Sequence, residues 1–178
     1  MRSETLLTTE RSTAHLTAYG YSRKFLILDS NLLLLLAIGL WNPRAIHTQK
    51  RLSGFSVDDF ELLKNFISSF EQIATTAHIL TEVSNLAGAA TGQTRDAIFT
   101  QLQSLFVTLD ERALDATILC SQPEFRIFGI TDAAMSLISS EMLLLTEDGK
   151  LANHLQRKGL NAWTLKHVRD LRDQANNA

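Results

Sequence analysis

The sequence predicts an α/β protein of three layers, α/β/α, in which helices cover both faces of a central parallel sheet. Short apolar runs of strand length alternate along the chain with longer segments of helical pattern, and this alternation is typical of parallel sheets. The most apolar stretch, residues 25–41 (FLILDSNLLLLLAIGLW), carries an acidic residue near its start. A membrane-spanning helix needs about 20 mostly apolar residues, so this stretch is too short and too interrupted to be one.

The first strand and helix come from that same stretch. Phe25 to Leu28 is a continuous apolar run, as expected for a central strand buried on both faces. Residues 32–40 are also apolar and predict a buried helix, which ends near Gly39 and is stopped by Pro43. Asp29 therefore falls where a strand turns into a helix.

A basic connection and an amphipathic helix follow. Residues 42–55 (NPRAIHTQKRLSGF) contain few helix-forming patterns and predict a connection with a helical turn. Ser56 is a favourable N-cap, acidic residues occupy the next turn, and apolar residues recur at helical spacing up to about Phe70.

The rest of the chain continues the alternation. Gly88 and Gly92 separate two helices, Gly159 ends the last of them, and only a frayed helical turn is expected after His167. Residues 106–109 are either a short strand or the end of a helix. The remaining expected strands are 73–76, 142–145 and 162–165. The remaining expected helices are 78–86, 94–105, 111–121, 132–140 and 150–158.

Composition places the chain among ordinary globular proteins. Its 178 residues are 45% hydrophobic and 20% charged, which suits one domain with a substantial core. The single cysteine, Cys120, excludes an internal disulfide and a zinc site made of several cysteines. The N-terminus lacks the long apolar segment of a secretory signal, so we expect a cytoplasmic protein without membrane segments.

Charge is unevenly distributed, although the net charge is only −2. Residues 52–149 contain 14 acidic residues and 4 Lys or Arg, which leaves 5 acidic residues and 13 Lys or Arg for the two ends. Two interpretations are open: ordinary variation among solvated helix faces, or a metal site rimmed by cations that bind phosphate. Charge alone favours the first.

Four acidic residues stand next to strand ends or helix starts. Asp29 and Asp148 directly follow expected strands, whereas Glu82 and Asp132 are expected in the first turns of helices. Ligands of parallel sheets bind at the carboxyl ends of the strands, so we expect these four side chains at one edge. Clustered carboxylates repel one another, and Mg²⁺ or Mn²⁺ relieves that repulsion and can activate water for phosphodiester cleavage. Each acid alone is also typical of a turn or a helix start; their joint placement favours a site.

The segments that carry these acids resemble, in the same order, the four acidic segments of the PIN-domain ribonuclease family. They are LILDSNLLLLL, TAHILTEVSNL, GITDAAMSLIS and LLLTEDGKLANHLQRKG, and the resemblance covers about residues 24–166. It implies that the catalytic, metal-binding carboxylates are Asp29, Glu82, Asp132 and Asp148. It implies that the supporting polar groups are Ser30, Asn31 and Thr146. Glu147 is an additional acid, either an alternate ligand or a solvent-facing residue.

The resemblance implies an endoribonuclease dependent on Mg²⁺ or Mn²⁺, which hydrolyses RNA to 5′-phosphate and 3′-hydroxyl products. The expected organisation is an N-terminal extension over 1–23, a PIN-like nuclease domain over 24–168 and a C-terminal tail over 169–178. The expected setting is a toxin masked by a small antitoxin protein. Two other functions stay open: a PIN-like nuclease of RNA maturation, defence or DNA processing, and a non-catalytic binding module. A homodimer is also open. Three cations follow Asp148 on the same expected helix: Lys150, Arg157 and Lys158. Two interpretations are open for them, contact with RNA phosphates or a solvated helix face.

Overall fold

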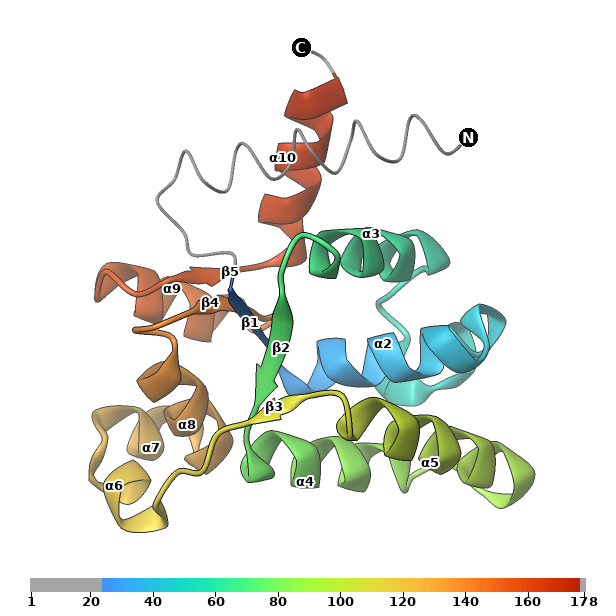
Figure 1. Ribbon diagram of the computed structural model, residues 1–178, viewed down its shortest axis with the longest axis horizontal. Coiled ribbons are helices and arrows are strands. Elements are labelled where there is room, and N and C mark those ends of the chain that lie inside the picture. Colours follow the sequence, from blue (N-terminus) through green and yellow to red (C-terminus); the bar gives the residue numbers. More distant parts are fainter. Residues whose placement is uncertain (1–23, 177–178) are drawn as a thin grey trace.

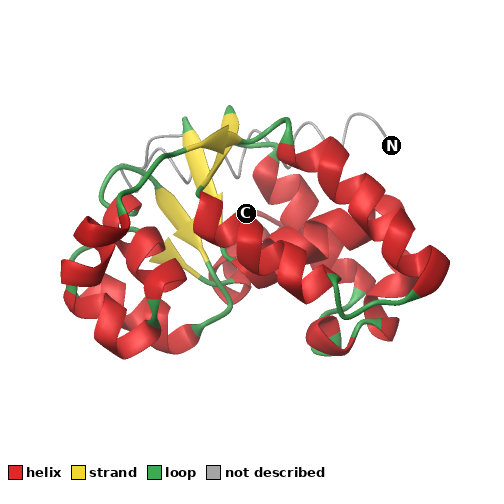
Figure 2. Ribbon diagram, turned by 90° about the horizontal axis from the view of Figure 1, so that it is seen from below, coloured by secondary structure: helices red, strands yellow, loops and turns green. Residues whose placement is uncertain are grey.

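The computed structural model describes residues 24–176 as a central sheet between two layers of helices (Figures 1 and 2). The N-terminal extension expected over 1–23 lies outside the described residues, as do residues 177–178. All strands of the five-stranded sheet are parallel, which confirms the predicted three-layer α/β/α fold. The strands are β1 (Phe25–Leu28), β2 (Gln72–Thr75), β3 (Asp110–Glu111), β4 (Leu143–Leu145) and β5 (Ala162–Trp163).

The strand order, β3-β2-β1-β4-β5, reverses direction at β1. The chain first steps from β1 to β2 and β3 on one side, and then returns to β4 and β5 on the other. β1 and β4 are hydrogen-bonded neighbours, with Leu28 opposite Leu145. In open α/β sheets such a reversal leaves a crevice outside the carboxyl ends of the two strands. The residues that follow β1 and β4 therefore flank this crevice.

The helices cover the two faces of the sheet in groups (Figure 1). One side carries α2 (Ser30–Trp41), α3 (Val57–Ile67), α4 (Ala77–Ala87) and α5 (Gly92–Phe106). The other carries α6 (Ala116–Ser121), α7 (Pro123–Phe128), α8 (Ile130–Ile138) and α9 (Gly149–Arg157). The 3₁₀ helices η1 (Pro43–Thr48) and η2 (Lys50–Leu52) follow α2, and α10 (Leu165–Asn176) follows β5 and packs against α3. Between residues 24 and 176, no helix is long and apolar enough to span a bilayer.

Helix α2 is buried almost along its whole length, which explains its continuous apolar sequence. It contacts α3, α4, α5 and η1, and residues 32–36 are all leucines with at most 4% of their surface exposed. Gly39 allows α2 to lie close against α3, because a Cβ at this position would meet the ring of Phe60 from α3 at 2.1 Å. The glycine is thus required by packing between two helices.

Replacing Gly39 with alanine is expected to lower the free energy of unfolding by about 1–3 kcal/mol, because the added methyl group forces the Phe60 ring out of its place. Urea unfolding of the variant and the wild type measures the difference. Gly54→Ala is the matched control, since a Cβ there meets nothing within 4 Å. Equal stabilities for Gly39→Ala and the wild type would contradict the close packing of α2 on α3.

Two of the predicted elements begin or extend differently. The helix predicted over 111–121 begins only at Ala116, because the Asp115 carboxylate accepts a hydrogen bond from the Thr117 N–H and caps it there. The frayed turn expected after His167 is a 12-residue helix, α10, so the tail boundary at 168 falls inside it. Val168 and Leu171 of α10 are buried in the core.

Two further elements were not predicted. Asp110 and Glu111 form the edge strand β3, while the segment before it, residues 106–109, is the end of α5 and a turn. Helix α7 begins with Pro123 at its first position and is followed by Gly129, whose φ is +95°. A proline at the start and a glycine after the end are signals that could have revealed this helix.

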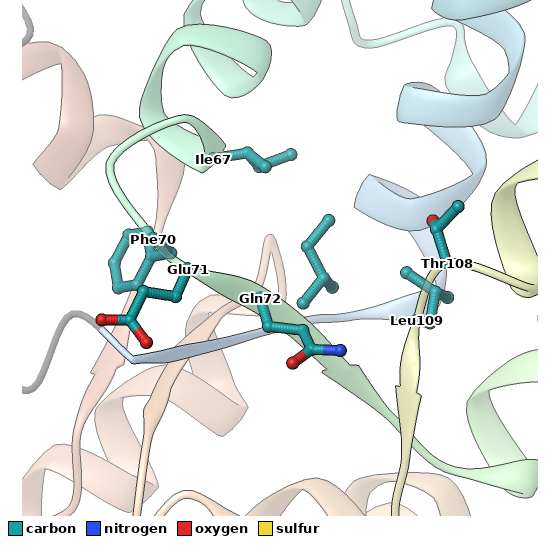
Figure 3. Close-up of a pocket in the computed structure, with 7 residues that line it drawn as sticks. Ile67, Phe70, Glu71, Gln72, Thr108 and Leu109 are labelled. Atoms are coloured by element: carbon teal, nitrogen blue, oxygen red, sulfur yellow. The ribbon is translucent and has the colours of Figure 1, made fainter.

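A cavity of about 420 Å³ lies at the opposite edge of the sheet from the crevice, where β2 begins and the chain enters β3. Its lining is mixed, with apolar residues from α3 and β2 beside Glu71 and Gln72. Figure 3 shows Ile67 and Leu109 on either side of this hollow. The cavity is therefore separate from the four predicted site acids.

Candidate functional site

Asp29 closes the carboxyl end of β1 and starts α2. Its Oδ1 accepts a hydrogen bond from the Leu32 N–H at 2.8 Å, as an N-cap does. Its Oδ2 accepts from the Thr146 hydroxyl and from the Glu147 N–H, both at 2.7 Å and both beyond the end of β4. Burial raises the pKa of Asp29, and these hydrogen bonds, with one from the Asn31 N–H, oppose the rise. The buried carboxylate thus joins the two strands that flank the crevice.

Thr146 connects Asp29 to Asp148. Its fully buried hydroxyl donates to Asp29 Oδ2 and accepts from the Asp148 N–H at 3.0 Å. The Asp148 side chain caps α9 in turn, since Oδ1 accepts from the N–H groups of Lys150 and Leu151. Oδ2 of Asp148 accepts no hydrogen bond within the described chain. One continuous hydrogen-bonded path therefore fixes the spacing of the two aspartates.

Asp132 lies in the first turn of α8, and the charges of the other three acids affect its pKa. Burial, followed by the charges of Asp148, Glu82 and Asp29, raises the pKa of Asp132 to about 7. Helices α4 and α8 are in contact although they belong to opposite layers, and this contact brings Glu82 towards Asp132. Glu82 is the sixth residue of α4 and so lies in its second turn, not in the first turn where it was predicted. The structure gathers all four acids at one edge of the sheet.

The four acids offer the oxygen donors of a divalent-cation site, but their side chains do not surround one common position. No three His, Cys, Asp or Glu side chains between residues 24 and 176 are grouped tightly enough to hold a metal ion. Carboxylate oxygens are nevertheless the donors that Mg²⁺ and Mn²⁺ prefer. Burial and the repulsion from the other acids raise the pKa of Asp132, and a bound cation would remove the repulsion. The donor chemistry of these residues suits such an ion, although the described residues form no closed site for it.

The other small polar residues of the site differ in their contacts. The Ser30 hydroxyl is buried and has no hydrogen-bond partner within the described part of the chain. Asn31 is less buried, and its Oδ1 accepts a hydrogen bond from Arg51 Nε of η2 at 2.8 Å. Glu147 turns towards α10, where its Oε1 accepts from the Leu165 N–H at 2.8 Å. Glu147 therefore caps α10. Arg51, which was not among the predicted site residues, is hydrogen-bonded to the described site residues only through Asn31.

The three predicted phosphate-binding cations have unequal surroundings. Lys150 is exposed at the start of α9 and forms no ion pair with another described residue. Arg157 donates from Nε to the Asn153 carbonyl of its own helix at 3.2 Å. Lys158 is paired with the buried Glu124 of α7 at 2.5 Å, and His154 lies 2.8 Å from the same oxygen. The Lys158 ammonium is thus occupied in holding α9 against α7.

Glu124→Gln is expected to lower the free energy of unfolding by about 2–3 kcal/mol at pH 7, because it removes a buried charge that two partners share. Burial opposes ionisation, yet hydrogen bonds from Lys158 and His154 lower the pKa of Glu124 to about 2. The folded state therefore holds the ionised form more strongly than the unfolded chain, where the pKa is near 4.5. This stabilisation is complete above about pH 4.5 and is lost as the pH falls towards 2.

Urea unfolding of the wild type and the variant at pH 7 and pH 3 measures this contribution. The difference between the two proteins should shrink at pH 3, and a difference that is the same at both pH values would contradict the ion pair. Glu141→Gln is the control, because Glu141 is exposed and forms no ion pair with a described residue.

Comparison of the chain with protein-family models, with curated proteins and with solved structures found no match in any of the three.

Proposed function

We propose that the protein is a Mg²⁺- or Mn²⁺-dependent endoribonuclease of the PIN type. The observation that carries the proposal is the proximity of the four acids. Thr146 links Asp29 and Asp148 at the ends of β1 and β4, and burial together with the charges of Asp148, Glu82 and Asp29 raises the pKa of Asp132 to about 7. The order of the acidic segments, by which the sequence resembles PIN-domain ribonucleases, supports the same function. An open α/β sheet offers its ligand site at this edge.

The residues of the chain have distinct parts in this function. A bound Mg²⁺ or Mn²⁺ supplies Lewis-acid stabilisation of phosphate charge and activation of a water molecule. Asp29 and Asp148 are held at a fixed spacing through Thr146, so they orient one side of the site. Glu82 and Asp132 accept no hydrogen bond from the described residues, and both are available as ligands from the helices α4 and α8.

The test is a cleavage assay on labelled single-stranded RNA with the full chain, in Mn²⁺, in Mg²⁺ and in EDTA. We expect cleavage with either cation, none in EDTA, and 5′-phosphate ends on the products. Cleavage that continues in EDTA would overturn the proposal, as would absence of cleavage on every RNA tried while Mn²⁺ is bound. Parallel reactions on single-stranded DNA separate an RNA-specific enzyme from one that processes DNA.

A second candidate, a non-catalytic nucleic-acid-binding module, is favoured by one observation. Both oxygens of Asp29 already accept hydrogen bonds that hold β1, α2 and β4 together, so this acid has a structural role in any case. Such a module would bind RNA equally well in Mn²⁺ and in EDTA and would cleave it in neither. The toxin setting, with a small antitoxin protein that masks the acids, follows from the family resemblance and is part of the nuclease proposal.

A further inference from the structure

Arg51 is held at the rim of the crevice by a residue that belongs to the candidate site. Its Nε donates to Asn31 Oδ1 at 2.8 Å, across 20 positions of sequence. Asn31 is the second residue of α2, and its own N–H is among the groups that lower the pKa of Asp29 by hydrogen bonding. The contact between α2 and η2 fixes this arrangement. A cation from the basic connection, residues 42–55, is thereby attached beside the acids.

Most of the N–H donors of the Arg51 guanidinium have no acceptor among the described residues. Only Nε is engaged, and among residues 24–176 no acceptor contacts its two Nη groups and no carboxylate pairs with it. Several other cations are paired with carboxylates: Arg169 with Asp59, Arg112 with Asp110 and Lys158 with Glu124. Arg51 is anchored instead by a neutral amide, which orients its planar group without cancelling its charge.

A guanidinium oriented in this way matches the geometry of a phosphate. Two Nη groups on one planar edge donate in parallel to two phosphate oxygens, which a lysine ammonium does not reproduce. The four acids repel the phosphates of an incoming strand, so affinity must come from cations around them.

We propose that Arg51 is a substrate-binding residue. Its guanidinium binds a backbone phosphate of the RNA next to the phosphodiester that is cleaved at the four acids. The substrate strand then runs from the crevice over the start of α2 to η2. This inference rests on the proposed nuclease function, and it adds the direction in which the strand leaves the site. It also gives the basic connection between α2 and α3 a part in binding the strand.

The first experiment measures binding without cleavage. Fluorescence anisotropy of a labelled single-stranded RNA is recorded with full-length Asp132→Asn protein in EDTA, alone and combined with Arg51→Gln, Arg51→Lys or Arg44→Gln. Arg44 is exposed in η1, belongs to the same basic connection and forms no hydrogen bond or ion pair with a described site residue, so it is the matched control. We expect about a tenfold loss of affinity for Arg51→Gln, a smaller loss for Arg51→Lys and almost none for Arg44→Gln. The salt dependence of binding should fall by about 0.7 in its logarithmic slope for Arg51→Gln.

The second experiment measures cleavage with Asp132 intact. Arg51→Gln should raise KM about tenfold and leave kcat within about twofold, because the lost contact positions the strand and does not touch the reacting phosphate. If the wild type cleaves RNA while Arg51→Gln and Arg44→Gln have the same KM and the same affinity, this inference fails and the nuclease function stands. If no protein cleaves RNA, the nuclease function fails, and the anisotropy still decides whether Arg51 binds the strand. Equal affinities of the Arg51→Gln and Arg44→Gln proteins, or no binding by any of them, would overturn the inference.

Discussion

Asp132→Asn is expected to reduce RNA cleavage by about a thousandfold or more. Burial and the charges of the other three acids raise the pKa of Asp132 to about 7, so Asp132 lies near all three of them. An amide in its place removes one negative charge and one cation ligand while keeping the shape of the side chain. Because phosphate affinity comes from cations at the rim, RNA binding should stay close to that of the wild type.

Initial rates of cleavage in Mn²⁺, with anisotropy on the same RNA, measure the two effects together. Asp58→Asn is the matched control, since Asp58 is exposed in the first turn of α3 and makes no ion pair with a described residue. The control should cleave at the rate of the wild type. An Asp132→Asn protein that cleaves within about tenfold of that rate would exclude the four acids as the catalytic centre.

The same substitution is expected to stabilise the metal-free protein by roughly 3 kcal/mol at pH 8. Burial and the neighbouring acids raise the pKa of Asp132 to about 7, far above the 3.8 of an unfolded chain. The folded protein therefore binds a proton at Asp132 more readily than the unfolded chain does. Ionised Asp132 lowers stability at pH 8, and this cost disappears as the pH falls through 7 towards 4. The uncharged amide avoids the cost at every pH.

Urea unfolding in EDTA at pH 5 and pH 8 tests this expectation. The variant should be more stable than the wild type at pH 8, by a margin that narrows at pH 5. Saturating Mn²⁺ should raise the melting temperature of the wild type and have little effect on the variant. Equal stabilities at pH 8 would show that burial and the neighbouring acids do not disfavour the ionised form of Asp132. A variant that is more stable yet inactive cannot owe its lost activity to misfolding.

The sequence predicted the residues around Asp29 well because several physical requirements coincide there. The apolar run before Asp29 and the apolar helix after it both demand burial, and a carboxylate between them needs hydrogen-bond donors. The N-cap of α2 provides one, at Leu32. The other partner, Thr146, lies 117 positions away. Its contact with Asp29 depends on the pairing of β1 with β4, which no local pattern specifies.

The elements that the sequence did not predict depend on contacts that short-range patterns do not contain. Acidic residues disfavour strands, so Asp110 and Glu111 gave no sign of β3, which exists because its backbone pairs with β2. The charged surface of α10 hid the spacing of Val168 and Leu171, which are buried against the core. Arg51 was part of a connection with no periodicity, and its place at the rim depends on how η2 packs on α2.

The central claim is that Asp29, Glu82, Asp132 and Asp148 bind a divalent cation for phosphodiester cleavage. A crystal of the full chain soaked in Mn²⁺ and measured at a wavelength with manganese anomalous scattering tests it directly. The account predicts an anomalous peak among these four side chains, with oxygen ligands from at least Asp132 and Asp148, and no such peak in an Asp132→Asn crystal. A wild-type crystal with no peak in this crevice, or a peak that persists unchanged in the Asp132→Asn crystal, would contradict it.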